Sequence, residues 1–176
     1  MNPAVRTIAV AAAICLALSV VRTAPARAQA TTAAAPDGTL VIAGDVTQAL
    51  TITPGDLKAM PRTTVTLSEE GRQVSYEGVL VGELLKRAGA PVGRDLSGKA
   101  VATYVRTIAK DGYQVVFSLA ELDPAFTPND IIVADTIDGK PLFDYQGPFR
   151  IVAPHDKRGA RSIRMLQRID VVRLLK

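Results

Sequence analysis

The side chains best suited to hold a charged ligand lie close together near the C-terminus, in the segment 147–164, here called the basic segment. A Gly-Pro pair and a short apolar run predict a strand, which Pro154 ends because proline has no backbone N–H to donate. Guanidinium groups bind phosphate or carboxylate through paired hydrogen bonds, and a glycine turn can add free amides. The pattern predicts either a site for an anionic or polar ring-bearing ligand or a solvated basic turn. Its ionisable residues after the strand are His155, Asp156, Lys157, Arg158, Arg161 and Arg164.

A carboxylate and several tyrosines are further candidates. Asp135 lies within an apolar run, 131–137, that predicts a buried strand. A buried carboxylate must be paired, so its partner would be a structural arginine or the guanidine-like edge of a ligand. The tyrosines could stack on a heterocycle or be ordinary core and rim residues. They are Tyr76, Tyr104, Tyr113 and Tyr145.

Several enzyme classes find no support. No serine lies in a G-x-S-x-G motif, so the pattern of a serine hydrolase is missing. Glu69 and Glu70 are adjacent, and neighbouring strand residues point to opposite faces, which makes them a poor acid/base pair. The chain has one cysteine, Cys15, and one histidine, His155. We therefore expect no disulfide, no catalytic thiolate and no zinc site.

The first 28 residues have the layout of a secretory signal peptide. A positively charged start precedes an apolar run (7–21), and Ala26-Arg27-Ala28 offers a cleavage site. The run of roughly 15 residues is shorter than the ~20 that span a membrane, although an uncleaved anchor remains the alternative. We expect a signal peptide over 1–28, a flexible lead-in over 29–38, one domain over 39–176, and a periplasmic or secreted protein.

The net charge of +4 at pH 7 is no argument for a nucleic-acid partner. Arg6, Arg22 and Arg27 would leave with the signal peptide, so much of the basic balance belongs to it. Residues 150–176 nevertheless carry eight Lys or Arg against two Asp. One end of the domain is therefore cationic, which suits a local anionic ligand better than a polyanion.

Periodicity and turn residues predict many short strands and three short helices. Thr53-Pro54 with Asp56 predicts one helix start, Gly78 precedes a second helix, and Ser118 caps a third. The whole pattern favours an α+β domain with antiparallel or mixed sheets. Strands are expected over 39–43, 46–52, 63–68, 73–76, 100–108, 113–117, 131–137, 141–143 and 149–153, with a closing strand after Ser162.

Five segments follow one another along the chain: TPGDLKAMPR, YEGVLVGELLKRAGAP, DGYQVVFSLAEL, IIVADTIDGKPL and GPFRIVAPHDKRGARSIR. In this order they resemble the molybdopterin-binding domain of the sulfite oxidase family, and more closely its short, secreted, single-domain members. The resemblance covers about residues 39–172 and implies the sulfite-oxidase-like fold, with mixed and antiparallel sheets and a few short helices.

One functional element of that family is missing from the chain. Family enzymes bind the pterin of a molybdenum cofactor and ligate the metal through a cysteine in the strand before the Y-x-G-V segment. Here that strand, 63–70, has Ser68 nearest the expected position. A serine oxygen is a harder and more basic ligand than a thiolate. The loop that holds the cofactor's phosphate end looks retained over 158–164.

The resemblance implies a non-catalytic periplasmic protein that binds a reduced pterin, or molybdopterin, without a metal and signals occupancy to a membrane-bound partner. The partner would be a signalling or redox protein. One alternative is a molybdopterin-dependent oxidoreductase without a cysteine ligand to molybdenum, and another is a ligand-free interaction module. The expected ligand-binding residues are Ser68, Asp111, Tyr113, Asp135, Tyr145, Arg150, His155, Arg158, Arg161 and Arg164.

Overall fold

The computed structural model describes residues 37–128 and 130–174 of the chain. The expected signal peptide and most of the expected lead-in lie outside the described residues. Within the described part, no helix combines the length and apolar composition that crossing a bilayer requires.

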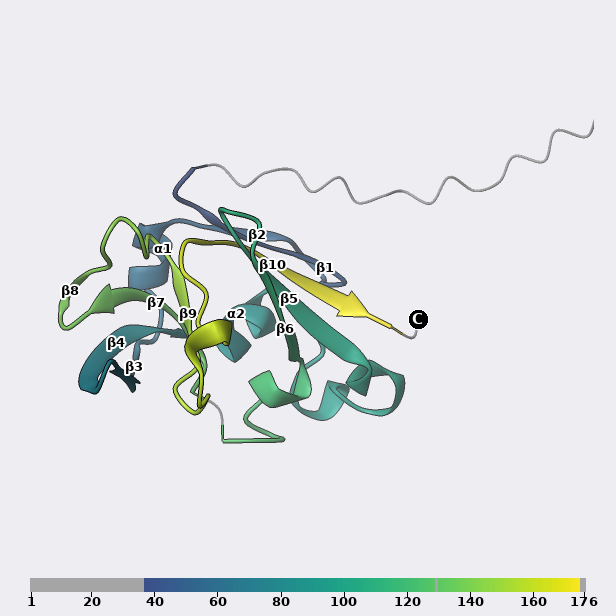
Figure 1. Cartoon of the computed structure of the whole chain (residues 1–176). Coiled ribbons are helices and arrows are strands. Elements are labelled where there is room, and N and C mark those ends of the chain that lie inside the picture. The colour runs from purple at the N-terminus through teal and green to yellow at the C-terminus, as the bar shows by residue number, and fades with distance from the viewer. Residues whose placement is uncertain (1–36, 129, 175–176) are drawn as a thin grey trace, which may run out of the picture. The chain divides into compact units, whose positions relative to one another are not determined.

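The first of two sheets contains the earliest and the latest strands of the domain (Figure 1). Its order is β2-β1-β10-β5-β6, with β1 and β10 parallel and the other neighbours antiparallel. The strands are β1 (Leu40–Gly44), β2 (Leu50–Ile52), β5 (Thr103–Ala109), β6 (Gln114–Ser118) and β10 (Leu166–Arg173).

The second sheet is antiparallel throughout. Its order is β3-β4-β7-β8, and β9 also pairs with β7. The strands are β3 (Thr63–Glu69), β4 (Arg72–Leu80), β7 (Ile132–Ile137), β8 (Lys140–Pro141) and β9 (Arg150–Val152).

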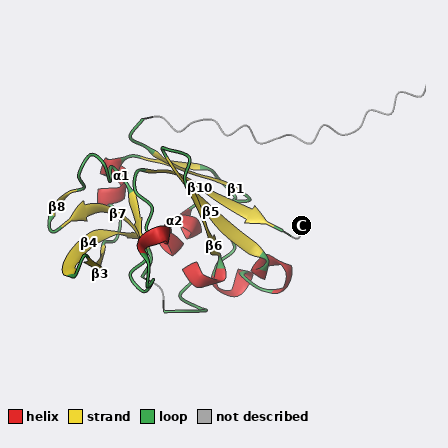
Figure 2. Ribbon diagram, viewed as in Figure 1, coloured by secondary structure: helices red, strands yellow, loops and turns green. Residues whose placement is uncertain are grey.

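The helices are short and join the strands (Figure 2). The predicted α+β fold, with mixed and antiparallel sheets and a few short helices, is therefore confirmed. The α-helices are α1 (Pro54–Lys58) and α2 (Val81–Arg87), and 3-10 turns cover Gly93–Asp95, Gly98–Val101, Ala120–Leu122 and Gly159–Arg161.

Two helical turns begin with reciprocal side-chain caps, at Thr53 and Ser118, where the sequence predicts helix starts. The Thr53 amide donates to Asp56 Oδ2 at 2.9 Å, and the Asp56 amide donates to Thr53 Oγ1 at 3.2 Å. Ser118 and Glu121 make the same exchange before Ala120–Leu122, at 3.1 and 3.2 Å. Each exchange satisfies two backbone donors that the first turn leaves free.

The β3–β4 hairpin is closed by the two residues Glu70 and Gly71. Their φ angles are 51° and 80°, so both are left-handed, as the tightest hairpin turns require. Glu69 then pairs with Arg72 across the last rung of the ladder. The turn fixes the register of β3 and therefore the direction in which each of its side chains points.

Two apolar clusters bury the two faces of the second sheet. The larger one joins that sheet, through Val79 and Val133, to α2 and to residues of the first sheet. The smaller one lies on the opposite face and includes Val65, Leu67 and Tyr76. Because side chains alternate along a strand, Ile132 and Ala134 belong to the smaller cluster although Val133 belongs to the larger.

Several expected strands differ from the structure. The strand expected over 73–76 runs from Arg72 to Leu80. The strand expected over 46–52 is reduced to Leu50–Ile52, because the chain turns at Val46, whose amide donates to Gly44 O at 2.9 Å. The strand expected from 100 begins at Thr103, after the turn Gly98–Val101. The strand expected over 141–143 is Lys140–Pro141.

The closing strand expected after Ser162 is β10, and its one acidic residue is not exposed. Asp170 is buried, since Arg106 Nη2 and Arg168 Nε donate to its two oxygens at 2.8 and 2.7 Å.

The close contact of β4 with β7 provides a test of the fold. A Cβ at Gly78 would lie 2.0 Å from Val133 O, so neither strand could keep its position. We expect Gly78→Ala to lower the free energy of unfolding by about 2 kcal/mol or more, measured by urea denaturation. Gly55→Ala is the control, because its Cβ would meet only Thr53 Oγ1 at 3.6 Å. Equal stability of the two variants would contradict the β4–β7 register.

Candidate ligand-binding site

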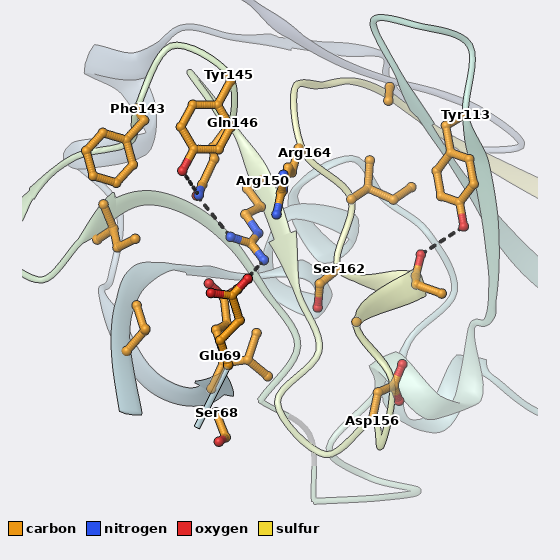
Figure 3. A pocket seen from close by; sticks show the side chains of 18 of the residues that line it. Ser68, Glu69, Tyr113, Phe143, Tyr145, Gln146, Arg150, Asp156, Ser162 and Arg164 are labelled. Carbon is orange, nitrogen blue, oxygen red and sulfur yellow. Dashed lines mark hydrogen bonds and ion pairs between the residues drawn. The ribbon is translucent and has the colours of Figure 1, made fainter. Parts of the chain in front are cut away.

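A cavity of about 920 Å³ opens between the β3–β4 hairpin, the β5–β6 turn and the basic segment (Figure 3). Residues from several parts of the chain line it, including Glu69 of β3, Tyr113 beside β6, Tyr145 and Gln146 before β9, and Arg164 of the basic segment. Its walls carry both charged and aromatic side chains. A flat polar molecule with an anionic group matches that combination.

A buried arginine forms the floor of the cavity. Arg150 of β9 is only 3% exposed, and its Nη2 donates to Glu69 Oε1 at 2.6 Å. Its Nη1 donates to Gln146 Oε1 at 2.9 Å and to the Tyr76 hydroxyl. Its Nε is buried without a hydrogen-bond partner among the described residues. The floor therefore carries a fixed positive charge balanced on one side by Glu69.

Tyr76 completes this network from β4. Its ring lies beneath the guanidinium, 4.7 Å from Arg150 Cζ, and its hydroxyl donates to Glu69 Oε1 at 3.1 Å. Burial raises the pKa of Tyr76 to about 12, so the hydroxyl keeps its proton at neutral pH. Glu69 Oε1 consequently accepts two hydrogen bonds, one from Arg150 and one from Tyr76.

An aromatic pair forms one wall. Phe143 and Tyr145 stack with ring centroids 5.7 Å apart and planes 5° apart, and they are 55% and 58% exposed. The Arg164 guanidinium lies 5.5 Å from the Tyr145 centroid. Figure 3 shows Arg164 next to Arg150 at the centre of the cavity. A planar ring could stack here at small cost, because the two aromatic side chains are already ordered against each other.

The opposite wall comes from the β5–β6 turn and the basic segment. The Tyr113 hydroxyl donates to Ala160 O at 3.0 Å, which ties the turn to the basic segment. Lys157 also lines the cavity. Within the described residues, neither Lys157 nor Arg164 forms an ion pair with a carboxylate of the chain. Both cations are therefore available to an anionic ligand.

Six of the ten predicted site residues line this cavity, and four do not. The six are brought together from β3, the β5–β6 turn, the segment before β9, β9 itself and the basic segment. Ligand binding by them stays a prediction. They are Ser68, Asp111, Tyr113, Tyr145, Arg150 and Arg164.

Asp135 is the first of the four to be corrected. Its carboxylate accepts two hydrogen bonds from Arg62, at 2.6 and 3.1 Å, and a third from the Thr136 hydroxyl at 2.8 Å. This is the structural arginine that the sequence left open as its partner. Asp135 is therefore buried, paired within the chain and outside the cavity lining.

Arg161, which was expected to bind the ligand, also lies outside the cavity lining. Arg161 donates to Asp156 at 2.6 and 2.7 Å and to Glu121 at 2.7 Å, and it lies 4.8 Å from the Phe117 centroid. The hydrogen bonds to Asp156 raise its pKa further above the ordinary arginine value. Arg161 is thus a structural link rather than an anion anchor of the cavity.

The remaining two residues also lie away from the cavity. His155 Nε2 lies 3.0 Å from Asp130 Oδ2, beside a separate small cavity of about 90 Å³. Arg158 is exposed and precedes the turn Gly159–Arg161.

The structure adds Glu69, Phe143 and Gln146, which sequence reasoning missed, and Lys157, which it placed in the basic segment but not among the expected ligand-binding residues. A signal for Glu69 was present. Val65, Leu67 and Glu69 alternate along β3, and the first two are buried on one face. The same period of two places Glu69 on that face and Ser68 on the exposed one. Gln146 carries no comparable local signal.

Side chains of the types that usually ligate metals are not clustered within the described residues. No three side chains among His, Cys, Asp and Glu are grouped there to hold a metal ion. Ser68 lies at the rim of the cavity on the exposed face of β3. The site as a whole is suited to bind an organic anion through cations, ring stacking and hydrogen bonds.

Comparison with known proteins identifies the fold and the family. No curated protein matches the chain. Among solved structures, the crystal structure of the sulfane dehydrogenase SoxCD from Paracoccus pantotrophus is similar, with a TM-score of 0.61 and 21% identity. The match covers 77% of this chain and 38% of that chain, and at this identity it shows the fold alone. The family model described as the oxidoreductase molybdopterin binding domain matches residues 28–174, and the chain therefore belongs to that family.

Proposed function

We propose that this protein is a non-catalytic pterin-binding member of the family, secreted to the periplasm, that reports ligand occupancy to a membrane-bound partner. It would belong to a short, single-domain subgroup that lacks the molybdenum-ligating cysteine. The observation that carries the proposal is a cavity with cations and aromatic walls in a chain whose only cysteine is Cys15.

The cavity residues fit the organic part of the family's cofactor. Arg150 lines the cavity with a nearly buried guanidinium, whose fixed positive charge suits an anionic or electron-rich ligand. Arg164 and Lys157 suit a phosphate or another anionic tail. Tyr145, already stacked on Phe143, suits a pteridine ring.

The same residues do not fit the metal. The metal of a molybdenum cofactor supplies redox chemistry, and the family holds it by a thiolate. The described part of the chain has no cysteine. Ser68, the residue nearest the expected position of the family's cysteine, belongs to the exposed face of β3. Binding of a pterin without metal therefore agrees better with the side chains than oxidoreduction does.

A partner protein could sense ligand binding through the exposed aromatic wall. Phe143 and Tyr145 face both the cavity and solvent, and a ring bound against Tyr145 would fix their orientation. A partner that contacts this edge would then bind one state of the wall better than the other. The partner's identity as a signalling or redox protein is part of the proposal.

The alternative function is a molybdopterin-dependent oxidoreductase whose metal is held without cysteine. Family membership and the place of Ser68 at the cavity rim favour it. Protein purified from a host that makes the cofactor should contain no molybdenum if our proposal is correct. Stoichiometric molybdenum, measured by elemental analysis, would instead support the oxidoreductase.

A matched pair of arginine variants tests the binding site. We expect Arg164→Ala to weaken the binding of tetrahydropterin or molybdopterin by roughly fivefold, about 1 kcal/mol, because an exposed charge is partly screened by solvent. Arg158→Ala removes the same charge from the same segment but outside the cavity lining, so the affinity should not change. Isothermal titration of the secreted protein is the measurement. Equal losses in both variants would indicate attraction by overall charge only, and the absence of binding to the unaltered protein would end the proposal.

A further inference from the structure

We propose that Glu69 selects the ligand ring by accepting a hydrogen bond from an exocyclic amino group. The site would thereby prefer an amino-substituted pteridine to one that carries a carbonyl at the same position. This inference rests on the proposed function and assigns the ring-reading residue within the same cavity.

Glu69 offers one free carboxylate oxygen to the cavity. Its Oε1 accepts from Arg150 Nη2 at 2.6 Å and from the Tyr76 hydroxyl at 3.1 Å. Among the described residues, no hydrogen bond reaches Oε2. Glu69 lines the cavity, and its side chain is 29% exposed. A carboxylate oxygen can accept two hydrogen bonds, so Oε1 is filled and Oε2 is available.

The carboxylate is held in one orientation. Arg150 is almost fully buried, and a buried guanidinium that loses its counter-ion is strongly destabilised. Glu69 therefore cannot turn away from Arg150 to suit a ligand. The short turn at Glu70 and Gly71 also fixes the end of β3 that carries Glu69. A binding group fixed in this way discriminates better than a mobile one, because its position does not adapt to the wrong ligand.

A fixed, free carboxylate oxygen distinguishes donors from acceptors. An amino group at ring position 2 of a pteridine would donate an N–H to Oε2. A carbonyl oxygen at that position would face a negatively charged oxygen and would leave Oε2 without a partner. Sites built to hydrogen-bond one group reject an analogue that lacks it, because the buried polar atom is then unsatisfied.

Other carboxylates near the cavity are less suitable. Asp135 is occupied by Arg62 and lies outside the cavity lining. Asp111 is exposed in the β5–β6 turn, and its Oδ1 accepts the Tyr113 amide at 2.9 Å. Glu70 is exposed in the hairpin turn. Asp156 also lines the cavity and is held by an ion pair, but both of its oxygens accept from Arg161. Glu69 combines a cavity position, partial burial and a fixing ion pair with one oxygen that accepts no hydrogen bond from the described residues.

The test compares two ligands that differ in one group. Tetrahydropterin carries the amino group, and tetrahydrolumazine carries a carbonyl in its place. We expect the unaltered secreted protein to prefer the pterin by roughly tenfold to hundredfold in Kd, measured by isothermal titration. In Glu69→Gln the side-chain oxygen should stay toward Arg150 and turn an NH₂ into the cavity. The preference should therefore disappear or reverse.

Two further variants make the result specific. Glu70→Gln removes the same charge from the next residue and should keep the preference. Asp111→Asn tests the competing carboxylate, and a preference lost there but kept in Glu69→Gln would overturn the inference. If Glu69→Gln fails to fold because Arg150 is left uncompensated, Glu69→Gln combined with Arg150→Gln removes both charges, and its preference should likewise be lost.

The outcomes separate the two proposals. If neither pteridine binds the unaltered protein, the proposed function fails and the inference fails with it. If the pterin binds but the ratio of the two Kd values is the same in the unaltered protein and the Glu69 variants, only the role of Glu69 is wrong. The ratio is measured on one protein sample at a time, so a lower folded fraction in a variant does not affect it.

Discussion

The ion pair between Arg150 and Glu69 is the constraint on which the site depends. A guanidinium that is 3% exposed has lost nearly all of its hydration, and only a close anion and further acceptors make that burial tolerable. Glu69, Gln146 and Tyr76 supply these from three different segments. In the second sheet β9 pairs with β7, and β3 pairs with β4. The ion pair therefore joins β9 to β3, two strands that share no backbone hydrogen bonds. The floor of the cavity is therefore fixed by polar contacts as much as by backbone pairing.

The charges of the domain have different tasks according to their partners. Arg62, Arg106, Arg161 and Arg168 are engaged by carboxylates of the chain and hold the fold. Arg164 and Lys157 face the cavity without such partners among the described residues. The domain thus combines the family's fold with a cationic, aromatic-walled cavity. The described residues include no cysteine whose thiolate could bind a metal. A shared fold does not by itself fix the chemistry of the site that it carries.

Features set by neighbouring residues could be predicted from the sequence. The caps at Thr53 and Ser118, the turn at Glu70-Gly71 and the order of the five family segments each depend on local chemistry or on a known pattern. The partners of the charged residues could not be predicted in the same way. Arg62 and Asp135 are 73 positions apart, and Arg161 and Glu121 are 40 apart, so these pairs arise only when the sheets assemble. Richness in arginine therefore indicated a basic region correctly but did not say which arginine would face the cavity.

The place of β10 has a consequence for how the molecule is made. It is the central strand of the first sheet, parallel to β1 and antiparallel to β5, although it is the last described strand of the chain. During synthesis the hairpins β1–β2 and β5–β6 cannot pair with β10, which lies between them, until the C-terminal end of the domain leaves the ribosome. Pairing between such distant segments is slow, because a long loop must close before any contact forms. The topology thus delays completion of the first sheet until its C-terminal strand is available, and the apolar edges of both hairpins stay exposed until then.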